Sequence, residues 1–171
     1  NRVLITGGRS GHSATASAEE YDPTQRAFSP VADMLEGRVQ HAAVRLATGH
    51  VLIAGGRDQT GQVLSSAELY DPATRRFEAV TDNMEFPRAD HVATLLPNGR
   101  VLLAGHSSPE THQLPTLEVY DPRTREFTST EVLDVPGTTR GAALPGGKTV
   151  VLGEGAAFAY DPVSLSTQFY A

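Results

Sequence analysis

The sequence predicts an all-β fold in which four-stranded antiparallel sheets repeat along the chain and stack side by side. Tyr-Asp-Pro recurs four times, with the tyrosines at positions 21, 70, 120 and 160. An apolar strand ending in glycine precedes each copy, and no segment has the 3.6-residue period of an amphipathic helix. Such a repeat indicates one supersecondary unit per copy, and no unit can bury its apolar faces alone.

Each unit contains the same order of strand and turn signals. A first strand, such as residues 41–46, leads through a short turn such as Asn98-Gly99 into the apolar run. A loop of variable length leads to the strand that ends in the tyrosine. Asp-Pro-x-Thr then forms a turn into a fourth strand. The expected units are residues 1–36, 37–85, 86–133 and 134–171, and the first of them lacks its first, inner strand.

Residues at fixed repeat offsets are expected to build the scaffold. The glycine pairs that follow the apolar strands suit close backbone approach, and no helix follows them to make a phosphate site. The four tyrosines, with Phe28, Phe77 and Phe127, are expected to pack between units with the tyrosine hydroxyls bonded. Glu19 and Glu68 are expected to be buried and to meet an arginine or backbone N–H groups, because an unpaired buried carboxylate costs several kcal/mol.

These motifs together resemble the Kelch repeat, including the blades of the central domain of galactose oxidase. The fourth strand carries phenylalanine where the family has tryptophan, and the fourth unit lacks the glycine pair. The resemblance implies a β-propeller whose blades pack face to face, usually six or seven in number. A closed four-blade ring, a second copy that completes the ring, and a segment of a larger propeller are all open. The last is favoured because the chain begins within a blade.

The composition excludes several functions. The net charge of −6 and the pI near 5.4 speak against nucleic acid, which is bound by basic surfaces. The apolar runs are far shorter than a membrane span of about 20 residues. There are no cysteines, hence no thiolate metal site and no tyrosine–cysteine cofactor of the copper-radical oxidases, and the six histidines lack metal-ligand spacing. No nucleophile motif occurs, so we expect no catalytic residue, cofactor or metal.

The variable loops are the expected binding surface, because function on a repetitive scaffold usually lies in its loops. Residues 9–15, 57–63, 106–115 and 154–156 fall on one rim, and the short turns fall on the other. The candidate binding residues on these loops are Arg9, His12, Arg57, Asp58, His106 and His112. The sequence therefore predicts a non-catalytic module that binds a protein or peptide, with carbohydrate as a less favoured ligand.

Two other functions stay open. An enzyme of the isomerase or lyase type, acting on a sugar or small acid, would gather an acid and a base at the channel mouth. A structural segment would have both end blades covered by other chains. The turn sequences resemble those of bacterial secreted Kelch-like proteins, which favours a location outside the cytoplasm.

Overall fold

The computed structural model describes residues 2–105, 116–132, 140–144, 148–153, 156–162, 164 and 166–170, and this part of the chain contains strands and no helix. The strands are β1 (Val3–Thr6), β2 (Arg9–Ser10), β3 (Ser13–Ala14), β4 (Ala18–Asp22), β5 (Ala27–Pro30), β6 (Ala42–Arg45), β7 (Val51–Ala54), β8 (Ala67–Asp71), β9 (Arg76–Ala79), β10 (Val92–Leu95), β11 (Val101–Ala104), β12 (Thr116–Asp121), β13 (Glu126–Val132), β14 (Arg140–Ala143), β15 (Thr149–Gly153), β16 (Ala156–Asp161) and β17 (Ser166–Tyr170).

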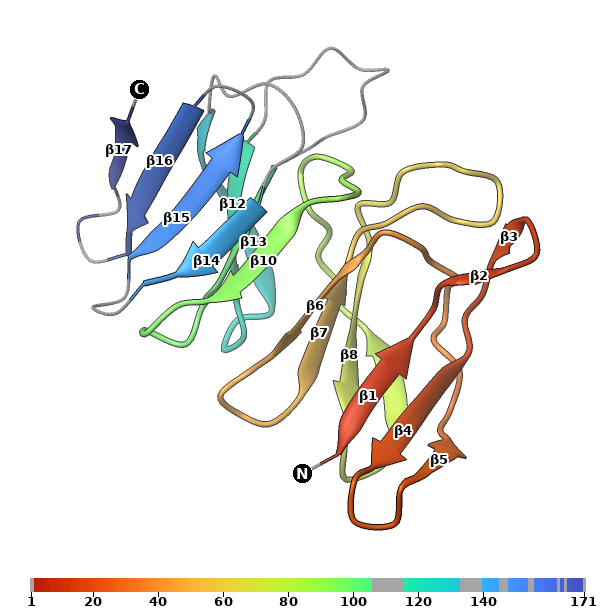
Figure 1. Ribbon diagram of the computed structural model, residues 1–171. Coiled ribbons are helices and arrows are strands. Elements are labelled where there is room, and N and C mark those ends of the chain that lie inside the picture. The colour runs from red at the N-terminus through yellow and green to blue at the C-terminus, as the bar shows by residue number, and fades with distance from the viewer. Residues whose placement is uncertain are drawn as a thin grey trace.

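Four antiparallel sheets follow one another along the chain as blades 1 to 4. Blade 1 has the strand order β1-β4-β5, and blades 2, 3 and 4 have the orders β6-β7-β8-β9, β10-β11-β12-β13 and β14-β15-β16-β17. The inner strand β10 contacts the inner strands β6 and β14, and the outer strands fan away from them (Figure 1). Blades 1 and 4 lie at opposite ends of an open arc. The predicted propeller blades are confirmed, including the missing inner strand of blade 1.

One register is repeated in all four blades. The residue opposite the repeated tyrosine is Val3, Val51, Val101 or Thr149. Because side chains alternate between the two faces of a strand, residues at the same offset face the same neighbouring blade. The core accordingly consists of three apolar clusters, each made by two consecutive blades. In the first of them Ala18 and Met34 pack with Ile53 and Tyr70.

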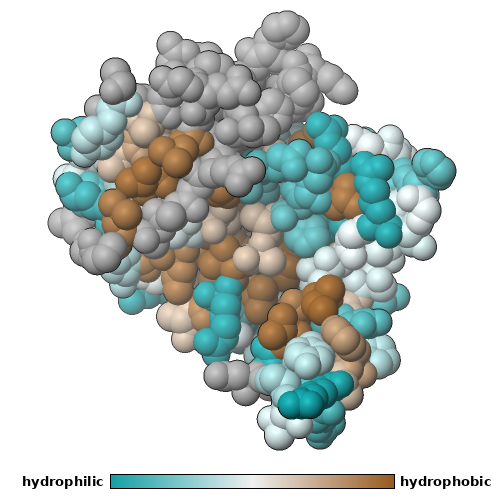
Figure 2. Space-filling model, in the orientation of Figure 1, coloured by the Kyte–Doolittle hydropathy of each residue, from teal (hydrophilic) through white to brown (hydrophobic). Residues whose placement is uncertain are grey.

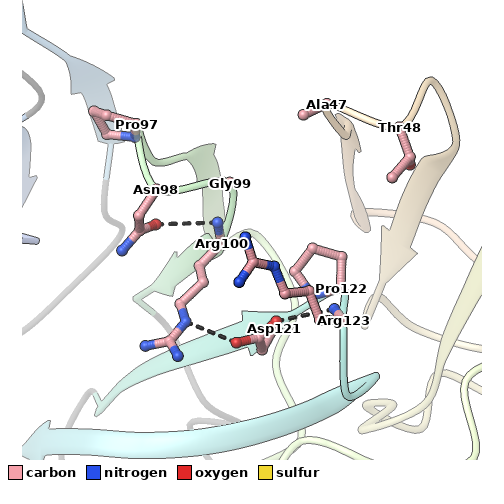
Figure 3. Close-up of a pocket in the computed structure, with 9 residues that line it drawn as sticks. All are labelled: Ala47, Thr48, Pro97, Asn98, Gly99, Arg100, Asp121, Pro122 and Arg123. Carbon is pink, nitrogen blue, oxygen red and sulfur yellow. Dashed lines mark hydrogen bonds and ion pairs between the residues drawn. The ribbon is translucent and has the colours of Figure 1, made fainter.

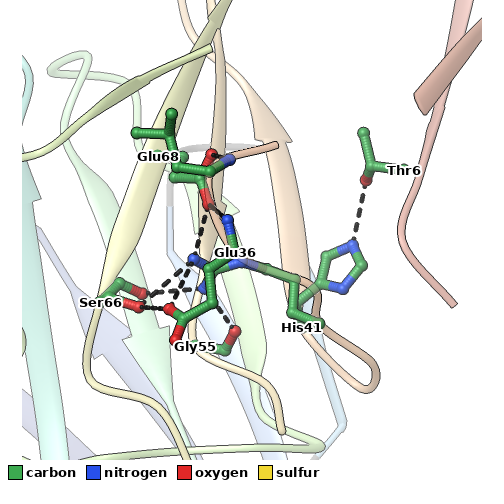
Figure 4. A network of polar contacts seen from close by, with 8 residues as sticks. Thr6, Glu36, His41, Gly55, Ser66 and Glu68 are labelled. Atoms are coloured by element: carbon green, nitrogen blue, oxygen red, sulfur yellow. Dashed lines mark hydrogen bonds and ion pairs between the residues drawn. The ribbon is translucent and has the colours of Figure 1, made fainter. Parts of the chain in front are cut away.

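A buried arginine connects the link ahead of β6 with the end of β7 and the start of β8 in blade 2. Arg38, in the link that precedes β6, is fully buried and pairs with Glu68 at 2.9 Å. Its guanidinium also donates to the carbonyl oxygens of Gly55 (2.8 Å) and Ser66 (3.2 Å). Glu68 further accepts the backbone N–H groups of Leu35 and Glu36. Figure 4 shows Glu68, Ser66 and Gly55 converging on this cluster. The predicted pairing of Glu68 is confirmed.

Blade 3 repeats this arrangement and blade 4 does not. Arg88 and Glu118 are both fully buried and form an ion pair, and Glu118 also accepts the backbone N–H groups of residues 85 and 86. In blade 4 the position of the glutamate is held by Phe158, which is completely buried. A charge cannot be buried without its partner, and residues 126–139 ahead of β14 contain no arginine.

Two expectations for blade 1 are wrong. Glu19, equivalent to Glu68, is exposed. The arginine-bearing link would precede an inner strand, and blade 1 has no inner strand in this chain. Phe28 is 59% exposed, whereas its equivalent Phe77 is 9% exposed, because no blade covers the outer side of blade 1.

The glycine pairs allow the links to approach the strand ends closely, as predicted. Gly55 has a φ of +63°, and a Cβ there would collide with the carbonyl oxygen of Arg88. Gly7 has a φ of +62°, and a Cβ there would collide with the carbonyl oxygen of Arg38. Each first glycine therefore faces the link to the next blade.

Candidate functional site

The two ends of the blades carry different kinds of connection. The β1–β4 and β7–β8 connections lie at one end together with the links between blades, and we call this surface the loop rim (Figure 1). The tight turns at 46–50, 71–75, 96–100 and 121–125 lie at the opposite end, which we call the turn rim. For loops 9–15 and 57–63 the predicted division into two rims matches the structure, and loop 106–115 and residues 154–155 lie outside the described residues.

The first loop of the loop rim is a small hairpin. Strands β2 and β3 pair in the register Arg9↔Ala14 and Ser10↔Ser13, around a turn that contains Gly11 at a φ of +62°. We expected a variable loop at residues 9–15, and strands of two residues carry no periodicity signal that would have predicted the hairpin. The side chains of Arg9 and His12 are exposed on the hairpin.

The second loop, residues 57–63, is held rigid by its own polar groups. One carboxylate oxygen of Asp58 accepts hydrogen bonds from the N–H groups of Thr60 (2.7 Å) and Gln62 (2.9 Å) and from the Thr60 hydroxyl (2.7 Å). The Thr60 hydroxyl is the main cause of the lowered pKa of Asp58. Arg57 donates to the carbonyl oxygen of Gly61 (3.1 Å), and its backbone bridges to Val39. Arg57 and Asp58 therefore shape the loop.

Gln40 and Asp90 extend the loop rim toward the propeller axis. They occupy equivalent positions two residues before the inner strands β6 and β10, and both are exposed. The Gln40 side chain donates to the Asp90 carboxylate at 2.7 Å, and the Asp90 N–H donates to the Gln40 carbonyl at 3.0 Å. Neither residue was among the candidates named from the sequence. The available signal was the position just before the repeated histidine, which is Gln40 in one unit and Asp90 in the next.

The histidines that follow these residues, His41 and His91, belong to the scaffold. His41 lies 3.1 Å from the Thr6 hydroxyl of blade 1 (Figure 4). His91 is buried, and burial, with the charge of Arg88, lowers its pKa to about 3. A histidine that stays neutral throughout the physiological range is a poor proton-transfer group at neutral pH.

Three cavities lie on the turn rim, one at each junction between neighbouring blades. The cavity of about 650 Å³ between blades 2 and 3 contains the ion pair between Arg100 and Asp121, at 2.8 Å (Figure 3). A second cavity of about 650 Å³ lies between blades 1 and 2, and one of about 280 Å³ lies between blades 3 and 4. Their repetition at equivalent junctions indicates that they arise from blade packing.

A buried carboxylate lines the cavity between blades 1 and 2. Glu20 is 5% exposed and accepts hydrogen bonds from the Tyr70 hydroxyl (2.8 Å) and Arg2 (2.9 Å), with Arg75 at 3.3 Å. Burial alone would raise the pKa of Glu20, but these hydrogen bonds and charges lower it overall. Burial and the Glu20 hydrogen bond raise the pKa of Tyr70 to about 12. Glu20 therefore stays ionised and Tyr70 stays neutral, which makes the pair a structural contact.

The last two predicted binding residues, His106 and His112, lie outside the described residues. Among the residues that are described, no three histidine, cysteine or acidic side chains come close enough to hold a metal ion. Nor does any helix of this part of the chain have the length and apolarity to cross a membrane.

The architecture of radially stacked four-stranded sheets is that of a β-propeller. The Kelch motif matches residues 1–35 and 38–84, which correspond to blades 1 and 2. The fold is similar to that of a solved structure described as "Structure of YjhT", with a TM-score of 0.70 and 18% sequence identity over 97% of this chain. The chain spans 64% of the length of that structure. No curated protein matches the sequence. Blades 1 and 2 therefore each contain a Kelch motif, and the fold of the chain is that of a β-propeller.

Proposed function

We propose that this protein is a non-catalytic binding module that holds a protein or peptide partner on the loop rim. The observation that carries the proposal is the contrast between the rims. Within the described residues, the turn rim repeats the same turns in blades 2 and 3, whereas the two described loops of the loop rim differ in sequence and structure. Repeated features serve the scaffold, and variable loops on a rigid scaffold serve recognition.

The described loops are suited to recognition because their shape is fixed before a partner arrives. The β2–β3 ladder orders the first loop, and the hydrogen bonds to Asp58 order the second. A preformed loop loses little conformational entropy on binding, which favours affinity. Arg9 and His12 are exposed on this framework, and arginine is among the residues that most often dominate interface energies.

The protonation states of the described polar clusters support binding over catalysis. The enzyme alternative requires an acid and a base within hydrogen-bond reach, each with a pKa near the working pH. Near the axis, Gln40 and Asp90 contact each other and His91 stays neutral. In the turn-rim cavities the carboxylates of Asp121 and Glu20 already pair with arginines.

The test is to select peptides from a random displayed library on the immobilised protein and to map where they bind. A loop-rim variant with Arg9→Glu and His12→Glu is compared with a turn-rim variant with Thr48→Glu and Arg123→Glu. All four residues are exposed, so both variants should fold like the parent protein. We expect the loop-rim variant to bind the selected peptides at least about tenfold more weakly, or roughly 1.4 kcal/mol. The turn-rim variant should bind them within about twofold.

Three results would count against the proposal. Peptides that lose affinity for the turn-rim variant would move the binding surface to the interblade cavities. Failure to select any peptide would favour the purely structural alternative. Turnover of a sugar or small acid that survives in the loop-rim variant would favour the enzyme alternative.

A further inference from the structure

We propose that the cavity between blades 2 and 3 binds a small organic anion through a phosphate or carboxylate group. The Arg123 guanidinium receives that group, and Asn98 and Thr48 supply further hydrogen-bond donors. The site lies on the turn rim, so it is separate from the peptide surface of the loop rim and does not depend on the function proposed above. The hollow itself arises from blade packing, but its lining differs from that of the other junctions.

An ion pair in the wall of this cavity belongs to the scaffold, because each blade has an equivalent pair. Arg100, directly ahead of β11, pairs with Asp121 at the end of β12 (Figure 3). The equivalent pairs of blades 1, 2 and 4 are Arg2–Asp22, His50–Asp71 and Lys148–Asp161, at 3.7, 4.0 and 3.6 Å. Repeated contacts serve the fold. Recognition of a ligand must therefore rest on a residue that departs from the repeat.

Arg123 is such a residue. It occupies the variable position of Asp-Pro-x-Thr, where blades 1 and 2 have Thr24 and Ala73. Among the described residues its guanidinium has no hydrogen-bond or ion-pair partner. Figure 3 shows the side chain pointing toward the turn that contains Asn98 and Gly99. Arg123 therefore brings a positive charge into the cavity that the other blades do not supply.

The carboxylate of Asp121 cannot neutralise both arginines. One of its oxygens accepts a hydrogen bond from Arg100, and the other accepts the backbone N–H of Arg123 at 2.9 Å. The Arg123 N–H, and then the hydrogen bond of Arg100 and the charges of both arginines, lower the pKa of Asp121, so it stays ionised at neutral pH. Two arginines and one carboxylate leave one positive charge in a protein whose net charge is −6. A concave site concentrates the field of such a charge and attracts anions.

The neighbouring cavity, between blades 3 and 4, provides a contrast. Asn98, Arg100 and Asp121 line both cavities and form the wall that they share. Arg123 lines only the cavity between blades 2 and 3, and Glu126 lines only the cavity between blades 3 and 4. The two cavities therefore differ in the sign of the charge that is added to the shared wall, which assigns the anion to the first.

The other polar groups of the cavity can donate to the same anion. Asn98 Oδ1 accepts the Arg100 N–H at 3.1 Å, which leaves the amide hydrogens of Asn98 for a ligand. The Thr48 hydroxyl, on the blade 2 side, lies 3.2 Å from His50 Nδ1, which can donate to it and leave its hydrogen free. A guanidinium matches phosphate and carboxylate groups with two parallel hydrogen bonds.

The size and polarity of the cavity suit a small organic molecule. Its volume of about 650 Å³ is within the range of roughly 300–1,000 Å³ that is usual for such sites. Pro97, Pro122 and Ala47 add apolar surface to the polar groups. Figure 2 shows hydrophilic and hydrophobic side chains side by side along the lower edge of the molecule, where the turns of blades 2 and 3 lie.

The test follows the backbone amide signals of the protein by NMR during separate titrations with glucose 6-phosphate, gluconate and uncharged glucose. We expect saturable shifts at Thr48, Asn98, Gly99 and Arg123 with at least one of the two anions and none with glucose. The anion that binds more tightly identifies the recognised group as phosphate or carboxylate.

Two variants with the same net charge separate the cavity from the rest of the rim. Arg123→Ala should weaken binding of the anion at least about tenfold. Arg76→Ala removes an exposed arginine that does not line the cavity, so it should change the affinity by less than about twofold. Arg123→Lys keeps the charge but loses the paired donors, and its affinity should fall between those of the parent protein and Arg123→Ala.

Four results would overturn the proposal. They are the absence of saturable shifts with both anions, equal losses of affinity in Arg123→Ala and Arg76→Ala, binding of glucose as tight as that of the anions, and shifts confined to residues 9–14 and 57–63. The last result would place anion recognition on the loop rim.

Discussion

Arg38 and Arg88 occupy equivalent positions in blades 2 and 3. Each is fully buried and paired with a glutamate that is also buried. Arg38→Ala should lower the free energy of unfolding by about 3–5 kcal/mol, because it leaves the Glu68 carboxylate buried without a cation. Arg100→Ala, which breaks an ion pair whose arginine is 46% exposed, should cost about 1 kcal/mol or less. Denaturant titration of both variants measures the difference, and equal costs would contradict it.

His91 makes stability depend on pH in a defined direction. The unfolded chain takes up a proton near pH 6.5, whereas the buried ring has a pKa of about 3. The unfolded state therefore binds more protons between these values, and stability falls as the pH falls. This histidine should remove about 2 kcal/mol from the free energy of unfolding between pH 7 and pH 5. His91→Gln, measured at both pH values, should lose correspondingly less, and parallel losses in the two proteins would argue that His91 does not titrate as described.

At the scale of the element, the first glycine of each pair is required by the approach of the next link. Gly55 and Gly61 both have positive φ, at +63° and +87°, but only at Gly55 would a Cβ collide with a backbone carbonyl oxygen. Gly61→Ala should cost about 1 kcal/mol for the conformation alone. Gly55→Ala should cost about 2 kcal/mol more, because the Arg88 backbone must also move. Thermal unfolding of the two variants is the check, and similar midpoints would show that the link is free to shift.

The strands that follow the repeated tyrosine could be predicted because their periodicity and the turn residues ahead of them both indicate a strand. The β2–β3 hairpin could not, since each strand has two residues and its turn depends on one glycine. The pairing of Glu68 could be predicted because the chain contains its partner, Arg38. The exposure of Glu19 could not be predicted, because it depends on a strand that blade 1 lacks.

For the molecule as a whole, the period of the sequence was sufficient to predict side-by-side sheets, because no sheet can bury two apolar faces alone. The candidate site was predictable only as a rim. Arg57 and Asp58 were correctly placed on a loop, but their hydrogen bonds show that they shape it. The contact between Gln40 and Asp90 joins residues fifty positions apart, and the only sequence signal for it is that these equivalent positions of the repeat carry different polar residues.

Hydrogen exchange with a selected peptide bound tests the central claim most directly, namely that the variable loops form the recognition surface. Backbone amides that become buried or more firmly hydrogen-bonded in a complex exchange more slowly. We predict that peptide binding slows exchange in residues 9–14 and 57–63 and leaves residues 46–50 and 96–100 unchanged. Slowed exchange confined to residues 46–50 and 96–100 would place recognition on the turn rim and contradict the account.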